Sequence, residues 1–172
     1  MKFKKTLLAV SLMMGITSFA NAADQGHGTV TFHGNIIDAP CSLAGDSVDQ
    51  KIEMGQISNV ELENGGSSTP KPFDIQLENC STATLKSVTA TFTGAAGANG
   101  NLGITGDAKG ASIVLTDGAG TKIELGKATA AQTLQDGNNT LAFSAYLQGD
   151  GASAAIVPGE FTGITDFTLA YQ

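Results

Sequence analysis

Tryptophan and arginine are absent from this sequence of 172 residues, and histidine and cysteine occur only twice each. The lack of arginine, together with sixteen acidic residues, makes the surface a poor match for phosphate backbones and anionic lipids. We therefore do not expect nucleic acid or a membrane surface as a partner. The lack of tryptophan removes a side chain well suited to stacking on sugar rings. Beyond the N-terminus, no apolar run approaches the ~20 residues that a membrane span needs.

Residues 1–22 have the three parts of a secretory signal peptide. Three lysines form a basic start, a nearly continuous apolar run covers residues 7–19, and the small residues Ala20 and Ala22 precede the expected cleavage point. The apolar run is too short to span a membrane. We therefore expect an exported, soluble chain that begins at Ala23.

The residues that follow this leader fit one domain. Removing 22 of 172 residues leaves 150, which is enough for one hydrophobic core and hardly allows two domains. Three of the nine lysines lie in the leader, so six remain against sixteen acidic residues, a formal net charge of −10. The simplest interpretation of this charge is solubility.

Both cysteines, Cys41 and Cys80, lie in the exported part of the chain. Exported proteins meet an oxidising compartment, so we expect one disulfide bond between them. Closing a loop of this length stabilises a fold by roughly 4 kcal/mol in the chain-entropy treatment. The alternatives are a metal pair and a redox dithiol. Both typically show CxxC spacing or neighbouring histidine ligands, and the sequence has neither.

Short runs rich in β-branched residues recur along the chain, separated by Gly, Asn, Asp and Ser. This texture is typical of an all-β sandwich or barrel with short strands. Alternation is clearest at residues 88–92 and 141–147, whereas helical periodicity is limited to a single turn predicted at 58–63. The predicted strands cover residues 28–38, 48–54, 73–79, 85–93, 111–115, 122–125, 140–148 and 161–171.

The sequence shows no pattern typical of an enzyme active site. GxSxG, HExxH and SxxK motifs are missing. The histidines, His27 and His33, would lie about 20 Å apart on one strand, too far to share a metal ion. We therefore expect no enzyme activity, no cofactor and no metal site.

The start of the exported chain carries an alternating pattern. Gly26, Gly28, Val30 and Phe32 fall at every second position. One face of an extended strand would therefore present two glycines followed by two apolar side chains. Such a face fits a hydrophobic groove beside the edge of another sheet, although an ordinary first strand of a sandwich would show the same pattern.

The C-terminal end alternates in the same way. Phe167, Leu169 and Tyr171 are separated by single residues, and Gly159 precedes this run. An ordinary last strand of a sandwich would again explain the pattern. The residues of the two ends do not by themselves decide between these interpretations.

Five segments taken in order resemble the chaperone-usher pilins, especially the major rod subunits of P and type 1 pili. The resemblance spans the whole exported chain, and its specificity lies in the ordered set rather than in any one motif. The segments are the Gly-x-Val-x-Phe-x-Gly run at 28–34, Ile-Ile-Asp-Ala-Pro-Cys-Ser at 36–42, Met-Gly-Gln-Ile at 54–57, Phe-Asp-Ile-Gln-Leu-Glu-Asn-Cys at 73–80 and the final segment 159–172.

The resemblance implies an all-β fold, an immunoglobulin-like sandwich that lacks its last strand. The groove left by that strand would expose core residues, which monomeric proteins generally avoid. In this family a periplasmic chaperone first fills the groove with its own strand. An outer-membrane usher then exchanges that strand for the N-terminal extension of the next subunit, a form of β-strand addition. The chain would thus be a structural subunit of a surface fimbrium used in adhesion.

Carried onto this sequence, the resemblance implies an N-terminal extension at 23–33 and a pilin domain at 34–172. The donor strand would cover about 24–32, with Val30 and Phe32 filling pockets and Gly28 allowing close approach. The groove and the chaperone would meet the C-terminal strand through residues that the sequence places at Gly159, Phe167, Leu169 and Tyr171. The implied partners are identical or related pilins, a periplasmic chaperone, an outer-membrane usher and, through the assembled pilus, host surfaces.

Three alternatives remain open at this stage. A minor adaptor or terminator subunit would share the same architecture. A tip adhesin is less consistent with the sequence, because family adhesins carry a separate receptor-binding domain and 150 exported residues leave no room for one. A stand-alone periplasmic β-sandwich would be a stable monomer without any partner.

Overall fold

The computed structural model describes residues 27–172. The expected signal peptide and the first residues of the expected donor strand lie outside the described residues. The chain divides into two units, one ending at Ile36 and the other covering 37–172, and we describe each by itself. No helix within the described residues is long and apolar enough to cross a membrane.

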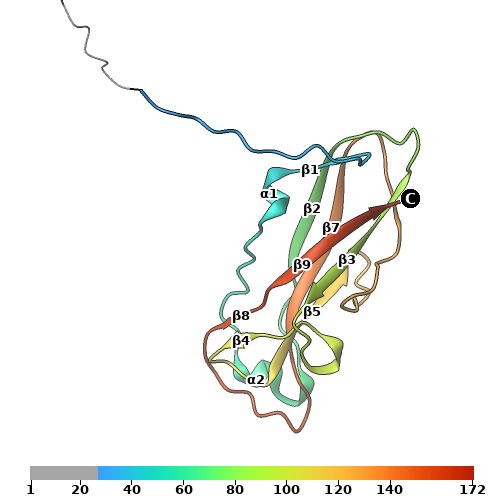
Figure 1. The fold of residues 1–172 in the computed structure, drawn as a ribbon. Helices are drawn as coiled ribbons and strands as arrows, with labels where there is room; N and C mark the ends of the chain where they lie inside the picture. Colours follow the sequence, from blue (N-terminus) through green and yellow to red (C-terminus); the bar gives the residue numbers. More distant parts are fainter. Residues whose placement is uncertain (1–26) are drawn as a thin grey trace, which may run out of the picture. The chain divides into compact units, whose positions relative to one another are not determined.

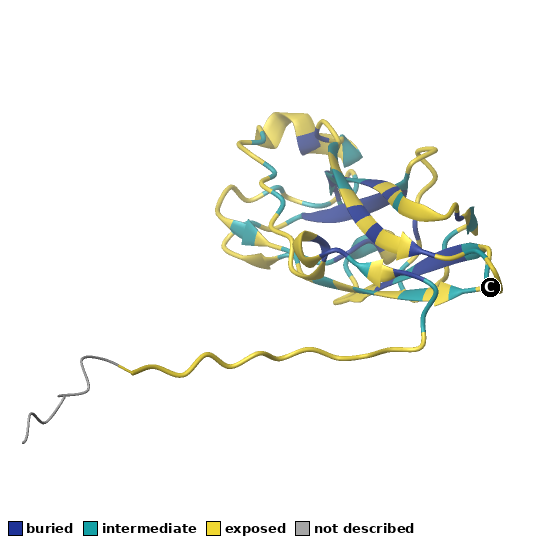
Figure 2. Cartoon of the chain, turned by 90° about the horizontal axis from the view of Figure 1, so that it is seen from above, coloured by how far each residue is buried: buried dark blue, intermediate teal, exposed yellow. Residues whose placement is uncertain are grey.

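In the first unit, the described residues 27–36 are extended and exposed along their whole length (Figure 2). The prediction of a strand at 28–38 is wrong for the single chain, because none of these residues is assigned to a strand. A β-strand needs a neighbouring strand to take up its main-chain hydrogen bonds, and among the described residues this stretch has none.

In the second unit, the larger sheet has four strands in the order β1-β2-β7-β5 (Figure 1). They are β1 (Ser42–Leu43), β2 (Lys71–Cys80), β7 (Gly137–Gly149) and β5 (Ala111–Asp117). All neighbours in this sheet are antiparallel. The predicted strands at 73–79, 111–115 and 140–148 are therefore confirmed, each with slightly wider bounds.

A second sheet has three strands in the order β6-β3-β9, and a small third sheet pairs β4 with β8. These strands are β6 (Gln132–Thr133), β3 (Ser87–Gly94), β9 (Thr165–Tyr171), β4 (Thr105–Gly106) and β8 (Phe161–Thr162). All of these pairs are antiparallel as well. Among the described residues, β1, β4, β6 and β8 have two residues each; β1, β4 and β6 carry too little sequence pattern to be predicted, whereas β8 falls within the strand predicted at 161–171.

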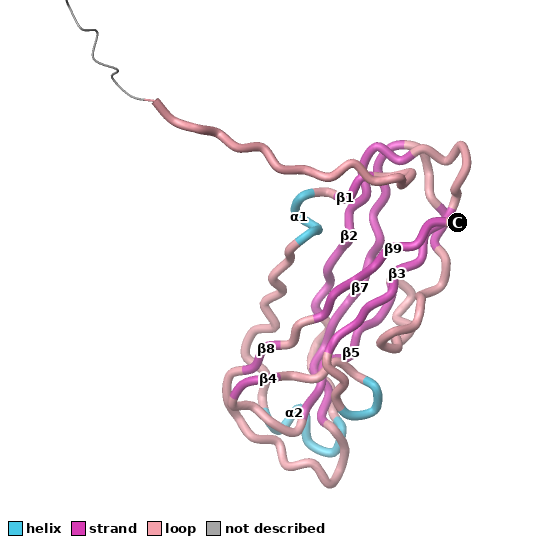
Figure 3. Tube along the Cα trace, in the orientation of Figure 1, coloured by secondary structure: helices cyan, strands magenta, loops and turns pink. Residues whose placement is uncertain are grey.

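Within residues 27–172, helical structure is limited to single turns (Figure 3). They are α1 (Gly45–Val48), α2 (Asn59–Leu62) and the 3-10 turns η1 (Glu63–Gly65) and η2 (Ala98–Gly100). The turn predicted at 58–63 is confirmed by α2. The strands predicted at 48–54 and 122–125 are wrong, because the segment 49–58 between α1 and α2 is not paired into a sheet and Lys122 forms only an isolated bridge with Thr116.

The predicted C-terminal strand at 161–171 is divided in the structure. It forms β8 and β9, separated by Gly163 and Ile164. Gly163 passes so close to the core that an added Cβ atom would collide with the Cδ1 atom of Ile113. The break thus brings the chain across the end of the larger sheet before β9 joins β3.

The two larger sheets pack on one hydrophobic core, which confirms the predicted all-β sandwich. Inward-facing residues of both contribute, including the fully buried Ile75 and Leu77 of β2 and Phe92 of β3. The predicted disulfide between Cys41 and Cys80 is present and joins the residue before β1 to the end of β2. Both sulfur-bearing residues are buried in the same core.

Candidate functional site

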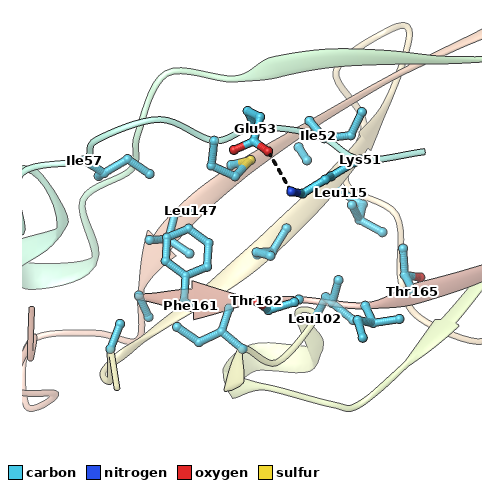
Figure 4. Close-up of a pocket in the computed structure, with 18 of the residues that line it drawn as sticks. Lys51, Ile52, Glu53, Ile57, Leu102, Leu115, Leu147, Phe161, Thr162 and Thr165 are labelled. Carbon is cyan, nitrogen blue, oxygen red and sulfur yellow. Dashed lines mark ion pairs between the residues drawn. The ribbon is translucent and has the colours of Figure 1, made fainter. Parts of the chain in front are cut away.

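A long apolar groove of about 1630 Å³ opens along the second unit. The segment 49–58 forms one wall, and the C-terminal stretch from Ile156 to Phe167 forms the other. Figure 4 shows Ile52 and Ile57 on the first side, with Phe161 and Thr165 across from them. Core side chains from both sheets form its floor, among them Phe73, Ile75, Phe92, Ile113, Leu115 and Leu147.

Four phenylalanine rings meet beneath this groove. Phe92 packs edge-on against Phe143 at a centroid distance of 5.1 Å and lies 6.3 Å from Phe167. Phe73 stacks on Phe143 at 5.5 Å. Phe73, Phe92 and Phe167 also line the groove, so its middle section is an aromatic surface open to a further apolar side chain.

The edge of β9 beside the groove is not paired with any described strand, because β9 is the last strand of its sheet. Ser87 and Gln172 exchange both main-chain hydrogen bonds, at 2.9 Å each. In an antiparallel ladder, hydrogen-bonded pairs of this kind alternate with pairs whose main-chain N–H and C=O groups point away from the partner strand. The N–H and C=O groups of Phe167, Leu169 and Tyr171 therefore point to the open edge, while their side chains point to the core.

The opposite wall also lacks a partner. Ile52, Met54 and Ile57 are half-buried and line the groove, yet the segment they belong to makes no strand. Gly55 has a φ of 79°, a conformation that favours glycine and bends the segment. The groove is thus bounded by two extended stretches, and neither is paired on the side that faces it.

The side chains at the groove mouth are charged. Asp49, Lys51 and Glu53 belong to one wall, and the Nζ atom of Lys51 lies 3.4 Å from Oε1 of Glu53 (Figure 4). On the opposite side the lining includes Glu160 and Asp166, and also Lys109, whose Nζ donates a hydrogen bond to a backbone carbonyl. The groove mouth therefore has four acidic side chains and two lysines, and its net charge is negative.

Tyr171, the last residue of β9, carries a titratable phenol that folding partly buries. Its side chain is half-buried against the core, and burial raises the pKa of its phenol above the ordinary value of 10.0. Burial has this effect because it disfavours the charged phenolate. The neutral phenol is therefore the form that this position favours.

The structure brings together part of the predicted site. Gly159 and Phe167 line the groove, but Gly159 lies before β8 rather than on the C-terminal strand. Leu169 and Tyr171 share the inward face of β9 and pack on the core, beyond the residues that line the groove. The residues of the donor stretch belong to the other unit.

The predicted donor stretch carries large apolar side chains that are exposed to water. Val30 is 76% exposed, Phe32 89% and Ile36 fully exposed, and all three fall on one face of the extended chain. Gly28 and Gly34 lie on the same face, and an added Cβ atom at either would touch nothing within 4 Å. Ile36 lies outside the extension predicted at 23–33, but the two-residue period of exposed apolar side chains reaches it.

Residues of the groove other than the C-terminal strand were also missed. The lining from 49–58 could have been recognised from its apolar residues, but the contribution of Phe73 and Phe92 depends on long-range packing. In residues 27–172, no three His, Cys, Asp or Glu side chains gather as metal ligands. The arrangement is suited to receiving an extended apolar strand, with main-chain hydrogen bonds from β9 and pockets for alternate side chains.

Comparisons with known proteins agree with this geometry. A family model described as fimbrial protein matches residues 30–172. The chain is 65% identical to the Fimbria A protein of Serratia marcescens and 52% identical to the major MR/P fimbria protein of Proteus mirabilis, in each case over the full length of both chains. The crystal structure of the P pilus rod subunit PapA is similar, with a TM-score of 0.68 and 36% identity over 78% of this chain and 100% of that one.

Proposed function

The chain belongs to the fimbrial protein family and is a structural pilus subunit, and we propose that it polymerises by donating residues 24–36 to the groove of a second copy. The single observation that supports this proposal is that two parts of the chain each expose apolar surface, and that their shapes are complementary. One unit exposes an alternating apolar stretch, and the other has an apolar groove beside an unpaired strand edge. Each is unfavourable in water, and pairing removes both.

The side-chain sizes support a specific register. Since every strand pair in the described chain is antiparallel, the donated strand runs antiparallel to β9. Placing Phe32 opposite Phe167 puts its ring over the aromatic floor. The same register sets Gly28 opposite the large Tyr171 and Ile36 opposite Gly163, where the absence of a side chain leaves room. A small residue then meets a large one at both ends of the pairing, with the Gly28 end lying beyond the groove lining.

The energetics favour a tight junction. Val30, Phe32 and Ile36 would each contribute about 1.5–3 kcal/mol on burial. The main-chain groups of Phe167 and Leu169 at the open edge would gain partners, which fixes the register. These gains are offset in part by ordering the donated strand, which is extended but unpaired in the single chain.

The pathway to this junction involves further partners. An exposed groove of this kind invites aggregation, so we place a periplasmic chaperone strand in it before assembly and an outer-membrane usher at the exchange step. The signal peptide predicted at 1–22 would bring the chain to the periplasm. The acidic surface and the structural role of the family favour a non-enzymatic function, with any host contact made through the assembled pilus.

The test replaces Phe32 with aspartate in the exported chain. Phe32→Asp places a charge where the aromatic floor would receive a ring, so we expect polymer formation to fall below detection. The matched control is Thr31→Asp, which adds the same charge on the opposite face of the strand and should still polymerise. Polymer length is measured by electron microscopy and by size on gels without boiling. Polymers of normal length from the Phe32→Asp chain would contradict the proposal.

A further inference from the structure

The solvent-facing side of the donated stretch carries histidine. Val30 and Phe32 occupy one face, so the alternating positions Thr31 and His33 lie on the other. When the apolar face enters the groove, this second face remains at its mouth. His33 follows Phe32 directly and is therefore held at the most firmly anchored part of the strand.

The two walls of the groove present charged side chains on that same outer side. On β9, Phe167 points to the core and its neighbour Asp166 is exposed. On the other wall, Ile52 faces the groove while Lys51 and Glu53 are 91% and 79% exposed. Adjacent strands of a sheet project side chains to the same side at each level.

The register derived above places His33 opposite Asp166. With Phe32 across from Phe167 in an antiparallel pair, the next residue of the donor meets the preceding residue of β9. Phe167 shares main-chain hydrogen bonds with the donor, so the neighbouring pair of His33 and Asp166 is of the non-hydrogen-bonded type. Side chains in such pairs are the closer ones, with Cβ atoms about 4.5–5.5 Å apart.

We propose that protonation of His33 tightens the junction between two copies of this chain, through the acidic groove mouth and chiefly through Asp166. This inference rests on the donated-strand function proposed above. The register sets Asp166 of β9 opposite His33, and the other charged groups that line the groove are Asp49, Lys51 and Glu53 on the opposite wall, together with Lys109 and Glu160. Asp38 lies on the donor's own chain. The acids outnumber the lysines, and Lys51 is already paired with Glu53.

The sign of the effect follows from linkage. Histidine gains its proton between about pH 8 and pH 5, whereas carboxylates stay ionised down to about pH 4.5. A protonated imidazole facing acids is favoured in the junction, so the added stability is present at the lower pH and is lost as the pH rises. Exposed pairs of this kind change an equilibrium by about two- to five-fold. The junction thus holds longer in mildly acidic surroundings.

The experiment uses the exported chain with Phe32→Asp, which cannot donate its own strand and leaves its groove free. It is refolded with a fluorescent peptide copying residues 24–37, and peptide release is followed by anisotropy at about pH 5.5 and about pH 7.5. We expect release to be about two- to five-fold slower at the lower pH. A His33→Gln peptide, or a subunit with Asp166→Asn in its groove, should bring the ratio of the release rates at the two pH values close to one. A Thr31→Gln peptide should leave that ratio unchanged.

A His33→Lys peptide gives an independent readout, because lysine stays charged at both pH values. Its release should be slow and nearly equal at the two pH values. Equal release rates of the unaltered peptide at both pH values would overturn the inference, as would a pH ratio that survives His33→Gln. A peptide that fails to bind at either pH would contradict the donated-strand function itself, so the two failures are distinguishable.

Discussion

The strands β7 and β9 carry the same alternation of apolar and polar residues but reach different degrees of burial. β7 lies between β2 and β5, and its inward side chains from Leu141 to Leu147 are buried. Of the described strands only β3 lies beside β9, and the inward side chains of β9 are all half-buried. The sequence pattern determines which face points inward, whereas the neighbouring strands determine how well that face is covered. The open edge of β9, which has no neighbour among the described strands, is the feature on which the proposed polymerisation depends.

The largest expected effect is a difference in lost stability between two alanine variants, one at Phe143 of β7 and one at Phe167 of β9. Phe143→Ala should lower the free energy of unfolding by about 3–5 kcal/mol, because a fully buried ring is lost from a packed core. Phe167→Ala should lower it by about 2 kcal/mol while the groove is open, because less apolar area is lost. Urea unfolding measures both values, and the difference should narrow when a peptide copying 24–37 fills the groove. If both variants lost the same free energy of unfolding while the groove is empty, the comparison of β7 with β9 would be contradicted.

The next effect concerns the covalent link that only the larger sheet has. Cys41 and Cys80 are 39 residues apart in sequence, and replacing both with alanine should lower the free energy of unfolding by about 4 kcal/mol. Urea unfolding of the double variant measures this loss. The unaltered chain under strong reductant serves as the control and should lose a similar amount. An unchanged midpoint would mean that the bridge does not support the β1–β2 end of the sheet.

The smallest effect is a pH dependence at Tyr171. Burial raises the pKa of this phenol, so the folded chain keeps it neutral where the unfolded chain ionises it. Stability contributed in this way is present below about pH 10 and is lost as the pH rises further. Tyr171→Phe should flatten the loss of thermal stability at high pH, and a filled groove should raise the pKa of Tyr171 further. A phenolate absorbance titration that is identical in the open and filled forms would contradict this.

Much of the sandwich could be predicted from the sequence. Residues 88–92 and 141–147 alternate strictly, and both form long strands because an alternating face needs a core on one side. The disulfide was predicted from the expected export and from the count of two cysteines, and it is present. The strands predicted at 48–54 and 122–125 are wrong. Their apolar residues do contact other parts of the fold, but pairing requires a neighbouring strand that local sequence does not reveal.

The functional site was predicted only in part for a related reason. Phe167 is recognisable as an inward residue of the last strand, but the groove it borders is defined by what is absent beside β9. Phe73 and Phe92 reach the same surface from strands distant in sequence. The extension was predicted to end at residue 33, and the period of exposed apolar side chains continues to Ile36.

The central claim, that a donated strand pairs with the open edge of β9, is tested most directly by amide hydrogen exchange on the peptide-filled subunit. The amides of Asp166, Thr168 and Ala170 face β3 and serve as controls within the same strand, whereas those of Phe167, Leu169 and Tyr171 face the open edge. The account predicts that both sets are protected to a similar degree once the peptide is bound. Rapid exchange at Phe167, Leu169 and Tyr171 beside protected controls would show that no strand pairs there.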